Sequence, residues 1–245
     1  MTGYLSTEIK RMLRGPRFII FAFVMPVLLY SLECMLYKNQ TIPHSGGITY
    51  SAWLMCSLAA YSAFTSSMHT TARVSHERAI GWHRQLRLTP LLPRTYLLTK
   101  VFVAMIVALP GPALVALFGA LTQDVHMTTG GWLQITLGIW IASLPCAVLG
   151  LVIGLYVQPE QQQMYLQGLI ILFGFLGGLL LPTTGFPDWL VAIIKIMPSY
   201  WLADIGHGAL LHDTRAVTGG LVLAAWTLVF SGAVVLSYRR EAARA

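Results

Sequence analysis

The chain has 245 residues, of which 56% are hydrophobic and only 10% are charged. Soluble domains carry about a quarter of charged residues, so this composition excludes an ordinary water-soluble domain and favours an integral membrane protein. The formal net charge of +7 does not indicate a nucleic-acid-binding protein, because the positive residues lie at the ends of apolar blocks and form no solvated basic face.

The beginning of the chain predicts an amphipathic helix on the membrane surface. Leu5, Ile9, Met12 and Leu13 recur at helical spacing, and the charged residues of this stretch lie away from that apolar stripe. A basic amphipathic helix of this kind lies in the membrane interface rather than across it. We expect residues 1–17 to form such an interface helix, the alternative being a loose basic leader.

Six apolar blocks approach or exceed the length of about 20 residues that a membrane-spanning helix needs. The blocks are Phe18–Tyr37, Thr49–Thr71, Tyr96–Leu121, Trp132–Val157, Met164–Leu181 and Val217–Tyr238. The segments between them are short and leave no room for a soluble catalytic domain, and the nucleotide-binding pattern G-x-x-x-x-G-K-S/T is absent from the sequence. The sequence therefore predicts an all-α integral membrane fold, with residues 1–245 forming one domain of six transmembrane helices.

Lysine and arginine are distributed unequally between the two sides that these blocks define. Four precede the first block, five lie between the second and third blocks with Lys100 just inside the third, three follow the sixth block, and the opposite side holds three. Positive residues stay on the cytoplasmic side of a membrane. We therefore expect both termini and the loop between the second and third blocks to be cytoplasmic.

Two polar features inside the apolar blocks are candidate functional sites. Glu33 is expected in the outer leaflet, where an ionisable group either has a function, reaches the lipid headgroups or pairs with a neighbouring helix. The inner half of the second block is rich in hydroxyls, which either line a cavity, bond between helices or satisfy carbonyls of their own helix. These hydroxyls belong to Ser62, Thr65, Ser66, Ser67, Thr70 and Thr71.

The cytoplasmic loop after the second block contains the basic, half-apolar stretch SHERAIGWHRQLRLTP, residues 75–90. We expect a short helix here, capped by Ser75, with Glu77 in its first turn and Pro90 at its end. Apolar residues rimmed by charge are typical of a surface that contacts a partner protein. The alternative is a helix on the membrane surface with its arginines extended towards the headgroups.

The fifth block has an irregular outer end. Breaks are predicted at Pro182, Gly185 and Pro187, followed by about ten helical residues, half the length of a span, and by another break at Pro198. Irregular backbone at membrane depth is tolerated only where protein or a wet cavity surrounds it. We therefore expect an outer re-entrant segment over residues 182–200, followed by an outer loop.

No group of residues in the sequence indicates a catalytic or metal site. His69, His76 and His83 recur every seven residues, but no cysteine or carboxylate completes a ligand set. Solvation is favoured over metal binding for the four ionisable residues of the predicted outer loop, which are Asp204, His207, His212 and Asp213. Because Glu33 is the one carboxylate well inside an apolar block, a membrane-embedded enzyme is a weak alternative and an ion-coupled transporter is not favoured.

The stretch HERAIGWHRQLRLTPLLPRTYLLTK resembles the segment of bacterial ABC type-2 permeases in which an acidic-basic pair is followed by Gly and then by Leu-Arg-x-Thr-Pro-Leu. The matching residues are Glu77, Arg78, Gly81, Leu86, Arg87, Thr89, Pro90 and Leu91, with Lys100 opening the third block. The likeness extends to LSTEIKRMLRGPRFIIFAFVMPVLL near the start and to FPDWLVAIIKIMPSYWLADI after the fifth block.

This resemblance implies the permease subunit of an ATP-binding-cassette exporter in the bacterial cell (inner) membrane. It implies that drug-like or antibiotic amphiphiles are exported, with lipid or lipid-linked glycan export as the alternative. ATP and magnesium would bind a separate ATPase subunit, with no cofactor on this chain, and a second permease copy or paralogue would complete the unit. The implied ATPase-coupling residues are Glu77, Arg78, Gly81, Leu86, Arg87, Thr89 and Pro90, and the implied substrate path contains Tyr61, Ser62, Thr65, Ser66 and Phe173.

Overall fold

The computed structural model describes residues 20–37, 40–42, 47–81, 93–123, 125, 127–182, 186–211 and 216–242. Within these ranges the regular structure is helical, and an isolated antiparallel bridge joins Thr41 to Thr49. The prediction of a mostly helical chain is confirmed for this part of the molecule. The predicted interface helix over residues 1–17 lies outside the described residues.

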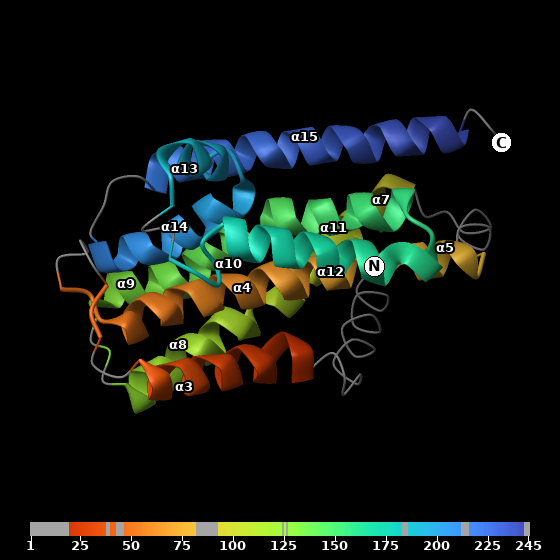
Figure 1. Ribbon diagram of the computed structural model, residues 1–245. Helices are drawn as coiled ribbons and strands as arrows, with labels where there is room; N and C mark the ends of the chain where they lie inside the picture. Colours follow the sequence, from red (N-terminus) through yellow and green to blue (C-terminus); the bar gives the residue numbers. More distant parts are fainter. Residues whose placement is uncertain are drawn as a thin grey trace.

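Helix α4 (Tyr50–Ala72) lies at the centre of an elongated bundle (Figure 1). Of its 23 residues 18 are buried, and these include polar as well as apolar side chains. The elements packed most extensively against it are α11 (Leu144–Tyr156), α8 (Pro110–Thr122), α7 (Pro93–Ala108), α14 (Pro198–Leu211) and α3 (Met25–Leu36). The second predicted block is therefore the core of the bundle.

The first and third predicted blocks form helices that are interrupted next to prolines. The π-helical turn η1 (Ile20–Val24) leads into α3, whose second residue is Pro26. Proline donates no backbone hydrogen bond and its ring crowds the carbonyl four residues earlier, which accounts for the widened turn before it. The third block is divided at Leu109, directly before Pro110, into α7 and α8.

The fourth predicted block is a nearly continuous helical stretch. It starts three residues earlier than predicted, because the side chain of Thr128 accepts a hydrogen bond from the Gly131 backbone N–H at 3.2 Å and so caps the helix. Its successive parts are α9 (Thr129–Leu133), η2 (Gln134–Gly138), α10 (Ile139–Ala142) and α11.

The fifth block forms α12 (Pro159–Leu176) and also begins before its predicted start at Met164. Proline is well placed in the first turn of a helix, and the acidic side chain of Glu160 favours the positive end of the helix dipole. The short segment between the fourth and fifth predicted blocks, residues 158–163, therefore belongs mostly to the first turns of α12.

The predicted re-entrant segment contains the short helix α13 (Asp188–Ile194), after which the chain turns by 93° into α14. The prediction of an outer loop after Pro198 is wrong, because α14 is helical up to Leu211 and packs against α4 and α15 (Ala216–Ala242). Gly206 lies at this contact, since a Cβ at that position would lie 2.9 Å from Cδ1 of Ile139 and 3.4 Å from Cβ of Cys56.

Three stretches of the described chain are long and apolar enough to cross a membrane, namely Thr95–Thr122, Thr129–Tyr156 and Val217–Ser237. The bent pair of α13 and α14 would make a fourth if it crosses as one span, and α3 is a shorter apolar helix. Helix α5 (Val74–Ala79) and the C-terminal end of α15 lie at the same end of the bundle (Figure 1). The structure thus fits an all-α membrane protein, and the number of six spans stays a prediction.

Two glycines of α11 allow this helix to approach α4 closely. Gly150 and Gly154 are four residues apart and therefore lie on one face of the helix. A Cβ at Gly154 would lie 2.8 Å from the carbonyl oxygen of Ala72, and a Cβ at Gly150 would lie 2.7 Å from the Cα of Met68. Both distances are shorter than an ordinary contact, so this small-xxx-small pair fixes how near the two helices can come.

We predict that Gly154→Ala lowers the melting temperature of the detergent-solubilised chain by roughly 3–10 °C, because overpacking a helix interface costs about 1–3 kcal/mol. The matched control is Gly168→Ala on α12, where an added Cβ meets nothing within 4 Å. This control should keep or raise the melting temperature, since alanine is the better helix former. Equal melting temperatures for Gly154→Ala and the unchanged chain would contradict the close packing.

Candidate functional site

The short helix α5 follows α4 after a single turn at Arg73 and carries the first predicted coupling residues. The prediction that Ser75 caps this helix is wrong, because α5 already begins at Val74 and has no side-chain cap. The hydroxyl of Ser75 instead donates a hydrogen bond to the carbonyl oxygen of Val157 at 3.1 Å. Ser75 therefore attaches α5 to the end of α11.

Glu77 forms a buried ion pair with a residue of the third block. The distance between Lys100 Nζ and Glu77 Oε1 is 2.5 Å, and the two side chains are only 3% and 12% exposed. The hydroxyl of Tyr96 donates to the other carboxylate oxygen of Glu77, and Lys100 Nζ lies 5.4 Å from the centroid of the Tyr96 ring. Both oxygens of the carboxylate thus hold α5 against α7.

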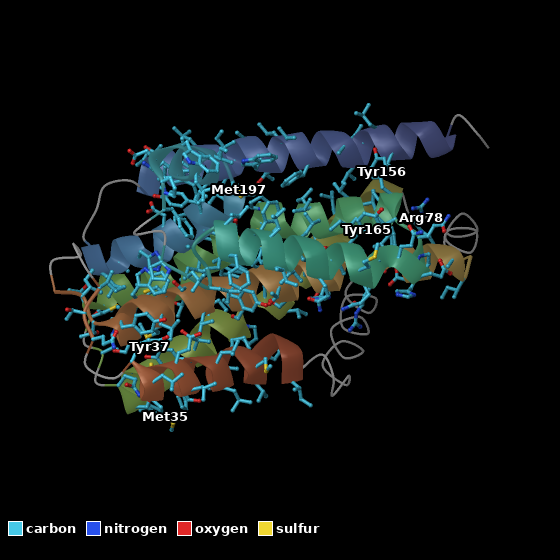
Figure 2. The ribbon with its side chains drawn as sticks, viewed as in Figure 1. Met35, Tyr37, Arg78, Tyr156, Tyr165 and Met197 are labelled. Carbon is cyan, nitrogen blue, oxygen red and sulfur yellow. The ribbon has the colours of Figure 1, made fainter. Side chains whose placement is uncertain are left out.

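Arg78 attaches α5 to the end of α11 as well. Its guanidinium donates a hydrogen bond to the carbonyl oxygen of Leu155, in the last turn of that helix. A positive side chain is favourable there, because the last carbonyls of a helix carry the negative end of its dipole. Figure 2 shows Arg78 at the same end of the molecule as Tyr156 and at the opposite end from Tyr37. We call Ser75, Glu77 and Arg78 the α5 anchor.

The helix ends earlier than predicted. Gly81 has a left-handed φ of 73° and its N–H donates to the Arg78 carbonyl oxygen at 3.0 Å, which terminates α5 well before Pro90. Ile80, just before this turn, is 71% exposed. The prediction of one continuous helix over residues 75–90 is therefore wrong. The remaining predicted coupling residues, Leu86, Arg87, Thr89 and Pro90, lie outside the described part of the chain.

The six hydroxyls in the inner half of α4, between Ser62 and Thr71, bond to their own helix. The Ser66 hydroxyl donates to the Ser62 carbonyl oxygen at 2.6 Å, and the Thr65 hydroxyl donates to the Tyr61 carbonyl oxygen at 2.9 Å. Ser67, Thr70 and Thr71 bond in the same way three or four residues back. The sequence left three alternatives for these hydroxyls. The described structure shows the third, in which each hydroxyl bonds to a carbonyl oxygen of its own helix.

The aromatic residues of the predicted path lie where α4 meets α12. The rings of Phe64 and Phe173 are in edge-to-face contact, with centroids 6.1 Å apart. Tyr61 is nearby, since a Cβ at Gly174 would lie 3.6 Å from its ring. Ser62 and Ser66 are 0% and 1% exposed, so these two hydroxyls face the protein interior in this conformation.

The polar residues at the opposite end of the bundle also have partners on neighbouring helices. Glu33 accepts a hydrogen bond from the Tyr50 hydroxyl at 2.8 Å, which is the helix-pairing alternative for this residue. His207 was predicted in a solvated loop, but it lies on α14, with its Nε2 2.9 Å from the Ser57 hydroxyl and its ring stacked 5.0 Å from that of Trp53. Asp204 also lies on α14, and His212 and Asp213 lie outside the described residues.

Residues 4–211 match the sequence profile of the ABC-2 type transporter family. The chain belongs to this family. It is also 29% identical over 231 residues to the putative transport permease YvfS of Bacillus subtilis strain 168, an alignment that covers 91% of this chain and 90% of that protein. Membership of the ABC-2 family makes the chain a membrane permease rather than an enzyme, as the sequence resemblance implied.

In this ABC-2 permease, sequence reasoning identified Glu77 and Arg78 but missed what they contact. Tyr96 was not singled out, and Lys100 was noted only as the start of the third block. A signal was present, because Lys100 is a lone charge near an otherwise apolar run and needs a buried partner of opposite sign. The choice of Glu77 as that partner depends on tertiary structure, since the two residues are 23 positions apart.

We predict that Lys100→Met strongly lowers the melting temperature of the purified chain, because removing one partner of a buried pair costs about 3–5 kcal/mol. The double variant Glu77→Gln/Lys100→Met should recover most of this loss, since it leaves no unpaired charge. The control is Lys195→Met, which removes an exposed lysine at the other end of the bundle. Equal losses in the single and double variants would show that the pair is not a coupled unit.

Proposed function

We propose that this ABC-2 permease is the membrane-spanning subunit of an exporter that moves drug-like or antibiotic amphiphiles out of the cell. ATP and magnesium bind a separate ATPase subunit, and this chain carries no cofactor. Family membership supports the transport role, and the absence of a G-x-x-x-x-G-K-S/T pattern from the sequence supports the proposal that a partner binds the nucleotide. The observation that carries the proposal is the α5 anchor.

The α5 anchor supplies a mechanical connection between a partner and the bundle. A force applied to the basic segment after Gly81 passes to α7 through Glu77 and Lys100, and to α11 through Arg78. Leu86, Arg87, Thr89 and Pro90 continue the same segment and are proposed to contact the ATPase. The exposed side chain of Ile80 belongs to this contact surface, because an apolar side chain beside charges is typical of a protein interface.

The working unit in this proposal contains two ATPases and two permeases, the second permease being a copy of this chain or a paralogue. Each permease crosses the bacterial cell membrane six times, with both termini and the α5 anchor on the cytoplasmic side, as the distribution of lysine and arginine predicts. The segment around α13 and the bend into α14 lie on the outer side and form the lid of the path.

The cargo is proposed to pass along the contact between α4 and α12. Tyr61, Phe64 and Phe173 provide aromatic surface there, which suits an apolar or cationic amphiphile. Strongly hydrophilic polymers are poorly suited to this surface, because the hydroxyls of Ser62 and Ser66 already donate their protons within α4 and offer no donor to replace lost water.

We predict that hydrophobic cationic drugs stimulate ATP hydrolysis by the complex purified from its native membrane. Phe173→Ala should shift the half-stimulating concentrations of these drugs by about threefold to tenfold, because a lost aromatic contact costs roughly 0.5–1.5 kcal/mol. The basal hydrolysis rate should stay the same. The matched control is Phe175→Ala on the same helix, where the phenylalanine is 44% exposed and should leave the drug response unchanged.

Two results would contradict this assignment of the cargo. Equal shifts from Phe173→Ala and Phe175→Ala would remove the contact between α4 and α12 from the path. If a broad panel of amphiphiles leaves hydrolysis unchanged while a lipid or a lipid-linked glycan precursor stimulates it, the complex exports envelope components instead.

A further inference from the structure

A carboxylate lies among aromatic rings at the end of the bundle opposite the α5 anchor. Glu33 and Tyr37 are four residues apart at the end of α3, and both contact Tyr50 at the start of α4. Tyr50 donates its hydroxyl to Glu33 Oε2 at 2.8 Å, and its ring centroid lies 4.9 Å from that of Tyr37. The ring of Trp53 continues the row, 6.0 Å from Tyr50. We call these four residues the α3–α4 cluster.

The α3–α4 cluster is accessible from outside the molecule. Tyr37 is 42% exposed, and Glu33, Tyr50 and Trp53 are each partly exposed. Figure 2 shows Tyr37 and Met35 at the same end of the bundle. The cluster therefore presents one carboxylate and several ring faces to the surroundings rather than to the protein core.

Anchoring at the membrane interface explains the aromatic rings but not the carboxylate. Tyrosine and tryptophan gather at the boundary between lipid and water in many membrane proteins. An acidic residue gains nothing from the hydrocarbon chains of lipid, and among the described residues the hydrogen bond from Tyr50 occupies one oxygen of Glu33. A negative charge beside the electron-rich faces of tyrosine and tryptophan is the combination that attracts an organic cation.

We propose that the α3–α4 cluster binds an organic cation, with the charge of an ammonium or phosphonium group beside Glu33 and its apolar substituents on the rings of Tyr37 and Tyr50. Two sources share this chemistry, a cationic amphiphile and the ammonium of a lipid headgroup. Binding at this site requires neither the ATPase nor ATP, so its failure would leave the proposed transport function standing.

The test measures binding of radiolabelled tetraphenylphosphonium to the purified full chain in a neutral maltoside detergent. Glu33→Gln keeps the shape of the side chain and should weaken binding about tenfold, a change of about 1.4 kcal/mol. Tyr37→Leu removes an exposed ring and should weaken binding about threefold, whereas Tyr37→Phe keeps the ring and should restore it. Glu160→Gln makes the same change at the opposite end of the bundle and should leave the affinity unchanged.

Short-chain phospholipids distinguish the two sources of the cation. Competition by dihexanoyl phosphatidylcholine, with none by dihexanoyl phosphatidylglycerol, would assign the site to lipid headgroups as well as to amphiphiles. Competition by neither lipid would assign it to amphiphiles alone. The proposal is wrong if the unchanged chain binds no tetraphenylphosphonium, or if Glu33→Gln and Glu160→Gln have equal effects while both variants keep the melting temperature of the parent.

Discussion

The six hydroxyls between Ser62 and Thr71 of α4 can lie at the centre of this bundle because each donates to a carbonyl oxygen of its own helix. In a membrane every buried polar group needs an internal partner, and the bonds from Ser62, Ser66 and Thr70 supply it without a neighbouring helix. With their protons bound within the helix, these small side chains leave α4 an effectively apolar surface that neighbouring helices can approach. Glycines on α11 and α14 can approach it closely, and the other helices pack around it.

The central position of α4 connects the two ends of the molecule. The α3–α4 cluster is at its first residue, the contact with α12 is midway along it, and the α5 anchor follows its last residue after one turn. A helix of this length spans about 35 Å, enough to cross the apolar part of a bilayer. In the proposed mechanism, a movement of α5 driven by a partner would reach the aromatic contact at Phe173 through one helix rather than through loops.

The helices could be predicted where apolar runs are long, as in α7, α8 and α15, because the membrane requires such runs. The prediction failed at α14, where glycines and ionisable residues favoured a loop. Those residues have packing roles that appear only in three dimensions, since Gly206 lies against Cys56 and His207 bonds to Ser57. The site followed the same pattern. Glu77 was identified from its motif, but its pairing with Lys100 depends on how α5 folds back onto α7.

The most direct test of the account is whether the end of the bundle that carries the α5 anchor contacts an ATPase. A photo-crosslinking amino acid placed at Ala79, which is exposed on α5, should capture the nucleotide-binding subunit in native membranes, and the same amino acid at Thr218, exposed near the start of α15, should not. We expect capture from position 79 alone. Capture from position 218, or none from position 79 while an ATPase co-purifies with the chain, would contradict this expectation.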